Sequence, residues 1–260
     1  MRYVRIFLLT FQSVFEERGR SLVWFLLSCI NPFIMMLFWR GANISSTTLS
    51  MITSYYFFLI IGGSIIMSHS EENIALIDIQ EGRLANYLLK PFPYYSLKWL
   101  EELPYRALQG SFGLIVVALF SFLFQVKLSV GSQSVVNFLL IFLMLISAVT
   151  LAQLFKVCLG FISFWTTDAY GIFQLSEMFM FILGGYIAPL SFYPSVVASI
   201  AYFLPFPYMI YFPIASIAGF YTTQQLVFIF LGQLVWISIF VFLYKSLWKN
   251  GLKQFTGVGQ

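Results

Sequence analysis

The sequence contains few charged residues. Asp, Glu, Lys and Arg make up only 9% of the 260 residues, whereas hydrophobic residues make up 60%. Soluble domains carry about 25% charged residues, so this chain has too little polar surface for a water-soluble globular protein. Together with a mean hydropathy of +0.88, the composition predicts an integral membrane protein. The apolar runs reach about 18 to 22 residues, whereas a barrel strand needs only about ten, so we expect an all-α membrane protein.

Cysteine and histidine are nearly absent too. Cys29 and Cys158 lie in apolar runs without a CxxC partner, and we interpret them as small core residues. His69 is the single histidine and has no second histidine or cysteine nearby, which argues against a metal site. The chain also lacks a G-x-x-x-x-G-K-[ST] loop for cradling phosphates. We therefore expect no ATPase site, metal or catalytic residue here, and an intramembrane enzyme is the weaker alternative.

Six apolar segments are predicted to cross the membrane. We expect them at residues 22–39, 52–67, 103–126, 135–159, 172–187 and 226–244. Among the Lys and Arg residues near the ends of the predicted spans, only Arg40 and Lys127 lie on one side of the membrane. The other side carries Arg2, Arg5, Arg18, Arg20, Arg83, Lys90, Lys98, Lys245, Lys249 and Lys253. By the positive-inside rule, both termini are cytoplasmic.

Residues 1–20 precede the first span and have a pattern of their own. Apolar residues recur at spacings of three and four, at Val4, Phe7, Leu8, Phe11, Val14 and Phe15. This pattern predicts an amphipathic helix in the cytoplasmic interface plane. The helix is either a simple membrane anchor or a surface that contacts a cytoplasmic partner. Residues 21–260 then form the transmembrane domain.

The segment at residues 189–220, between the fifth and sixth predicted spans, is apolar but broken by prolines. No uninterrupted piece is long enough to cross, and a seventh crossing would place the C-terminal lysines outside. We expect a re-entrant hairpin of short helices in the outer leaflet, with its prolines against other spans rather than lipid. The prolines are Pro189, Pro194, Pro205, Pro207 and Pro213.

The connector between the second and third spans, residues 68–102, gathers many of the polar residues. Its pattern predicts a short helix, a break at Gly82, a second short helix and a stop at Pro91. A compact, amphipathic segment of mixed charge offers a docking surface, and a solvated connector is the alternative. In a docked state we expect Leu84, Leu88 and Leu89 to be anchors, with Asp78, Glu81 and Arg83 setting the orientation.

The connector resembles a block found in the type-2 ABC exporter permeases, in their six-span bacterial subfamily. The matching string is I-x-x-G-x-L-x-x-x-L-L-K-P, formed by Ile79, Gly82, Leu84, Leu88, Leu89, Lys90 and Pro91. Residues 164–169 (FWTTDA), 184–213 and 247–259 resemble further blocks in the same order.

The resemblance implies a permease subunit in the bacterial cytoplasmic (inner) membrane. It further implies a second permease, identical or paralogous, and two copies of a separate ATPase that binds ATP and Mg. The segment from Asp78 to Pro91 would be the coupling helix that contacts this ATPase.

Lys156 and Glu177 are charged residues that lie inside predicted spans. An unpaired charge at the bilayer centre costs roughly 2.5 to 3.5 kcal/mol, so Lys156 and Glu177 are expected to face each other. Snorkelling of Lys156 to the interface and a substrate-facing role remain open. No charged residue lies between Met178 and Tyr244, which favours a hydrophobic or amphipathic cargo. A secondary transporter or channel is a further alternative, although its inverted repeat would show broken helices in both halves.

Overall fold

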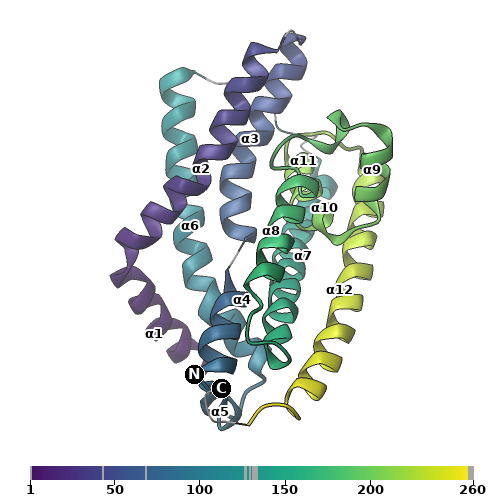
Figure 1. The fold of residues 1–260 in the computed structure, drawn as a ribbon. Helices are drawn as coiled ribbons and strands as arrows, with labels where there is room; N and C mark the ends of the chain where they lie inside the picture. The colour runs from purple at the N-terminus through teal and green to yellow at the C-terminus, as the bar shows by residue number, and fades with distance from the viewer. Residues whose placement is uncertain are drawn as a thin grey trace.

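The computed structural model describes residues 2–42, 44–67, 69–125, 128, 130 and 134–256, with side chains from residue 7 onward except at residue 124. The predictions for Lys127 and for the side chains of Arg2, Val4 and Arg5 lie outside this description. In the part that is described, the protein is all-helical and has no strand, as predicted (Figure 1).

Seven helices are longer than a few turns: α1 (Arg2–Glu16), α2 (Arg18–Gly41), α3 (Ser46–Ile66), α6 (Tyr94–Phe124), α7 (Val135–Gly160), α8 (Tyr170–Leu183) and α12 (Thr223–Gly251). The shorter ones are α4 (Ser70–Asn73), the π-helix η1 (Ile74–Gln80), α5 (Leu84–Leu88), the 3₁₀ turns η2 (Phe161–Phe164) and η3 (Leu190–Phe192), α9 (Ser195–Tyr202), α10 (Pro205–Met209) and α11 (Tyr211–Ile217).

Five described helices are long and apolar enough to cross a membrane: α2, α3, α6, α7 with η2, and α12. They correspond to five of the six predicted spans. The remaining prediction, residues 172–187, falls on α8, which has 14 residues. At 1.5 Å per residue α8 is about 21 Å long, shorter than the roughly 30 Å of hydrocarbon.

Side-chain caps begin three of the long helices. Ser45 and Ser134 accept hydrogen bonds from backbone N–H groups in the first turns of α3 and α7, each at 3.2 Å. Thr222 begins α12 with a capping box, in which Gln225 accepts a hydrogen bond from the Thr222 N–H at 2.9 Å. These caps satisfy N–H groups that have no partner within the helix.

The start of α6 corrects a predicted boundary. The sequence suggests a start near Leu103, before Pro104, but the helix begins at Tyr94 and runs for 31 residues with Pro104 inside it. A proline removes one backbone donor and disfavours a helix interior, but Pro104 is buried and the helix continues through it. The early turns carry Lys98 and Glu101 to the connector.

The proline-rich segment forms η3, α9, α10 and α11, at the end of the molecule opposite α5 (Figure 1). Pro189, Pro205, Pro207 and Pro213 are buried, which agrees with the expected packing against other helices. The expectation is wrong for Pro194, which is exposed. Pro194 occupies the N-cap of α9, and that helix begins on the outer surface of the protein.

Side chains of α2 and α3 satisfy the irregular backbone that follows α8. The Tyr55 hydroxyl donates to the carbonyl of Gly185 at 2.8 Å, and the Tyr56 hydroxyl donates to that of Ile187 at 2.7 Å. The Asn31 amide donates to the carbonyl between them at 3.3 Å. Non-helical backbone at membrane depth needs such partners, because lipid offers none.

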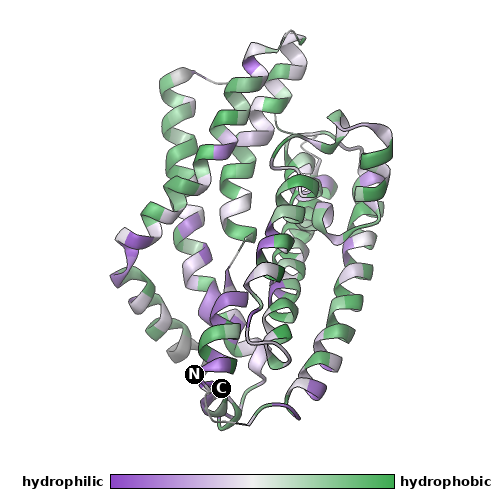
Figure 2. Ribbon diagram, viewed as in Figure 1, coloured by the Kyte–Doolittle hydropathy of each residue, from purple (hydrophilic) through white to green (hydrophobic). Residues whose placement is uncertain are grey.

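Polar residues gather at one end of the bundle. Figure 2 shows hydrophilic colour around α4 and near α5, whereas α7 and α12 are hydrophobic along most of their length. Both chain ends lie toward the α5 end (Figure 1). The N-terminal helix α1 contacts α6, and within α1 the centroid of the Phe11 ring lies 6.2 Å from those of Phe7 and Phe15.

Candidate functional site

The connector between α3 and α6 contains α4, η1 and α5, and a tight turn separates η1 from α5. The predicted break is present at Gly82, whose φ of +79° lies in the left-handed region. Residues with a Cβ rarely adopt this conformation, which is why glycine suits the position. The N–H of Gly82 bonds to the carbonyl of Ile79 at 3.3 Å, and the following helix ends before Pro91. The helix–break–helix prediction is therefore confirmed.

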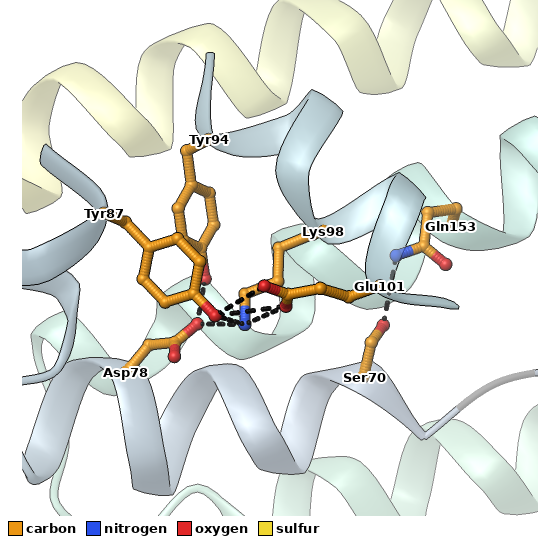
Figure 3. A network of polar contacts seen from close by, with 7 residues as sticks. All are labelled: Ser70, Asp78, Tyr87, Tyr94, Lys98, Glu101 and Gln153. Atoms are coloured by element: carbon orange, nitrogen blue, oxygen red, sulfur yellow. Dashed lines mark hydrogen bonds and ion pairs between the residues drawn. The ribbon is translucent and has the colours of Figure 1, made fainter. Parts of the chain in front are cut away.

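An ion cluster joins η1 to the start of α6 (Figure 3). The Lys98 ammonium lies 2.7 Å from Asp78 and 3.1 Å from Glu101. The Asp78 side chain is 2% exposed and that of Lys98 is 8% exposed, so the ion pair is shielded from water. The Tyr94 hydroxyl also donates to Asp78. Because neither charge is well solvated, separating η1 from α6 here would leave both charges without a partner.

Tyr87 of α5 also contacts this ion cluster. Its hydroxyl donates to Glu101 at 2.8 Å, and the Lys98 ammonium lies over its ring, 4.5 Å from the centroid. Burial raises the pKa of the Tyr87 hydroxyl to about 12, so the group stays protonated and can donate at any physiological pH. The cluster thus fixes both η1 and α5 to one turn of α6.

A second ion cluster surrounds Lys156 of α7. Its ammonium lies 2.6 Å from Glu71 of α4 and also pairs with Glu177 of α8. The Lys156 side chain is fully buried, Glu71 is 2% exposed and Glu177 is 32% exposed. The structure therefore brings together the predicted pair and adds Glu71, which the sequence analysis missed. A single ammonium joins the connector to two other helices.

A third set of polar contacts lies beside these clusters and was also missed. Arg106, inside α6, donates to the carbonyls of Ile65 and Ile66 at the end of α3 and to the side chain of Gln153. Gln153 in turn contacts Ser70 at 3.5 Å (Figure 3). The arginine thus caps the free carbonyls of one helix with a charge from another. An arginine within a predicted span was the available signal, because such a charge needs a partner.

The connector rests on an apolar base formed by α7, η2 and the end of α12. Leu84 and Ile74 are fully buried beside Phe161, and Ile79 is 8% exposed. This corrects the expectation that Asp78, Ile79 and Leu84 belong to an external docking surface. Ile79 and Leu84 instead pack on the protein's own helices, and Asp78 is paired with Lys98.

The outer side of α5 carries the remaining predicted coupling residues. Leu88 is 47% exposed and Leu89 is 85% exposed, although both are large and apolar. The charged or rigid residues around them, Glu81, Arg83, Lys90 and Pro91, are also exposed. The ion pair between Arg83 and Glu81, at 3.5 Å, is open to water and therefore contributes little to stability.

No group of three or more His, Cys, Asp or Glu side chains suited to a metal ion occurs among the described residues. The cysteines Cys29 and Cys158 are free and buried. The α5 end of the molecule therefore consists of ion pairs and apolar contacts. The exposed side of α5 lies on a base of buried side chains.

Comparison with known protein families decides the identity. The family model described as "ABC-2 family transporter protein" matches residues 22–259. The chain belongs to the ABC-2 transporter family. Comparison with curated proteins finds no match, and comparison with solved structures finds none either. The match covers most of α2 and every later element through α12. ABC-2 family permeases work in general with ABC ATPase partners.

Proposed function

We propose that this chain is the permease subunit of an ABC exporter that moves a hydrophobic or amphipathic substrate out of the cytoplasm or the inner leaflet. A separate ATPase would bind ATP and Mg and supply the energy. The working complex would contain a second permease, identical or paralogous, and two ATPase chains. We place it in a bacterial inner membrane with both termini in the cytoplasm. Membership of the ABC-2 family and the five apolar helices support this proposal.

The observation that carries the proposal is the contrast between the two sides of the connector. The inner side is buried and held by ion pairs, whereas the outer side exposes Leu88 and Leu89. Exposed leucines beside charged residues form a suitable anchor for a partner protein. We therefore restrict the coupling surface to the exposed set: Glu81, Arg83, Leu88, Leu89, Lys90 and Pro91, with Gly82 providing the turn.

The two ion clusters connect the segment that carries this surface to the membrane helices. Lys98 ties η1 to α6 through Asp78, and Lys156 ties α4 to α7 through Glu71. A displacement of α5 by the ATPase would move these helices with it, because breaking either buried pair leaves an uncompensated charge. Such a charge costs roughly 3 to 5 kcal/mol.

The opposite end would form the outer side of the exporter. We propose that α8 completes a sixth crossing together with the segment that follows it, and that η3 to α11 form the re-entrant hairpin. The hydrogen bonds from Tyr55 and Tyr56 to this segment support a position at membrane depth. From Met178 to Tyr244 the chain carries no charge, which suits an apolar or amphipathic cargo.

The test uses the tagged chain, purified in mild detergent from its native membranes. A copurifying protein with a G-x-x-x-x-G-K-[ST] loop, identified by mass spectrometry, is the expected result. The double variant Leu88→Ala/Leu89→Ala should weaken this association by roughly 2 to 4 kcal/mol, as expected for central anchors. The control Val135→Ala/Val136→Ala changes residues that are 74% and 58% exposed at the far end of α7, and should leave binding unchanged.

Two outcomes would contradict the proposal. Absence of any ATPase from the wild-type preparation would argue against an ABC permease that works with a separate ATPase. Wild-type binding and ATP hydrolysis in the Leu88/Leu89 variant would show that α5 is not the coupling element.

A further inference from the structure

The C-terminal end of α12 carries a basic stripe, which the positive-inside rule uses to place this end in the cytoplasm and to which the proposed function assigns no partner. Lys245 and Lys249 lie four residues apart on α12, and Lys253 follows four residues later, just beyond the helix. Residues four apart lie on the same helical face, about 6 Å apart along the axis. All three lysines are exposed, and none forms an ion pair with a described carboxylate.

The stripe continues an exposed apolar face of the same helix. Phe228, Val235, Phe242 and Lys249 follow one another at intervals of seven, or nearly two full turns, and so share a face. The three apolar members are 65%, 58% and 72% exposed. Figure 2 shows this change along α12, which is hydrophobic over most of its length and hydrophilic at the end near the C-terminal segment.

A face that is apolar and then cationic is complementary in polarity to an anionic amphipathic molecule. The acyl chains of a phospholipid would lie along Phe242 and the turns before it, and its anionic headgroup would lie against the lysines. Anionic lipids attract Lys and Arg near the membrane surface, with a contribution of about 1 kcal/mol for each residue. We propose that this end of α12 is a binding site for an anionic phospholipid.

The charge pattern argues against a second copy of the chain as the occupant. Residues 178–260 contain no Asp or Glu side chain, so α12 carries only positive charge. Two copies related by a two-fold axis along the membrane normal would bring Lys245 and Lys249 against the same lysines of the other copy. Like charges in contact across an interface are destabilising, whereas an anionic headgroup neutralises them.

Attraction to the helix dipole explains part of the pattern but not all of it. Lys249 lies in the last turn of α12, where a cation is favourable next to the free carbonyl groups. That effect fades within one turn and does not reach Lys245. The dipole effect would also stabilise the helix equally in every lipid, so it predicts no preference for an anionic lipid.

The experiment is native mass spectrometry of the full chain in detergent, titrated with phosphatidylglycerol or phosphatidylcholine. The wild type should bind phosphatidylglycerol more tightly. The variant Lys245→Gln/Lys249→Gln should lose about fivefold in this affinity for each lysine removed, the equivalent of roughly 1 kcal/mol. Replacement of the same lysines by arginine should keep the preference. The control Arg18→Gln/Arg20→Gln removes two exposed charges from α2 and should also keep it.

Four results would overturn the proposal. The glutamine variant could bind phosphatidylglycerol as the wild type does, or the Arg18/Arg20 control could lose as much. The variant could weaken both lipids equally, which would indicate a structural role for the lysines. Finally, the variant could keep its lipid preference and lose a copurifying ATPase, which would assign the stripe to a protein partner. None of these results depends on the coupling role of α5.

Discussion

Replacement of Lys156 by methionine should be among the most destabilising single changes in this chain. Methionine fills a similar volume but leaves Glu71 without its cation, and the Glu71 side chain is only 2% exposed. Removing one partner of a buried ion pair costs roughly 3 to 5 kcal/mol. Glu177 also loses its partner, but it is 32% exposed and can be solvated in part, so it adds little.

The three members of the cluster should therefore differ in a definite order. Glu177→Gln leaves Lys156 paired with Glu71 and should cost less than about 1 kcal/mol. Glu71→Gln keeps an acceptor beside Lys156 but removes the buried negative charge that the ammonium faces, at a cost of roughly 1.5 to 3 kcal/mol. The double variant Lys156→Met/Glu71→Gln should be more stable than Lys156→Met alone, because no carboxylate is then buried without a cation.

The assay is the free energy of unfolding, measured by titration with dodecyl sulfate in mixed micelles and followed by circular dichroism. Lys90→Met serves as the matched control, because Lys90 is exposed and should cost no more than about 0.5 kcal/mol. The reasoning is refuted if Lys156→Met behaves like this control. A Glu177→Gln variant as unstable as Lys156→Met would likewise show that burial does not set the order.

Three further predictions concern the turn, the hairpin and its exposure. Gly82→Ala should destabilise the chain by about 1 to 2 kcal/mol because φ is +79°, whereas the exposed-helix control Gly171→Ala should cause no loss, and an unchanged unfolding free energy in Gly82→Ala would contradict this. Tyr56→Phe should cost roughly 1 kcal/mol through the lost bond to Ile187, and an unchanged thermal midpoint would show that the bond contributes nothing. In a chain with both native cysteines replaced, an impermeant thiol reagent added outside should label Ser195→Cys, which is exposed, and not Ser216→Cys, which is 2% exposed.

Much of the architecture was predictable because it depends on local composition. Apolar runs bounded by polar residues predict membrane helices, and five of the six predicted spans meet the length and hydropathy of a crossing. The glycine at position 82 predicts a turn, since few other residues adopt its backbone conformation. Hydropathy could not set the N-terminal end of α6, because its first turns carry the charged residues Lys98 and Glu101, which pair with each other. Nor could it set the length of α8, after which the backbone of Gly185 accepts a hydrogen bond from Tyr55.

The partners of the buried charges were decided only by the tertiary structure. The sequence alone shows that a charge within a span must be paired, as at Lys156, because hydrocarbon does not solvate it. It does not show that Glu71, 85 residues earlier, supplies a partner. Nor does it show that Leu84 faces inward while Leu88 and Leu89 face outward, since all three belong to one apolar pattern. Hydrophobic pattern determines that a side chain leaves water, and only the packed helices determine which surface receives it.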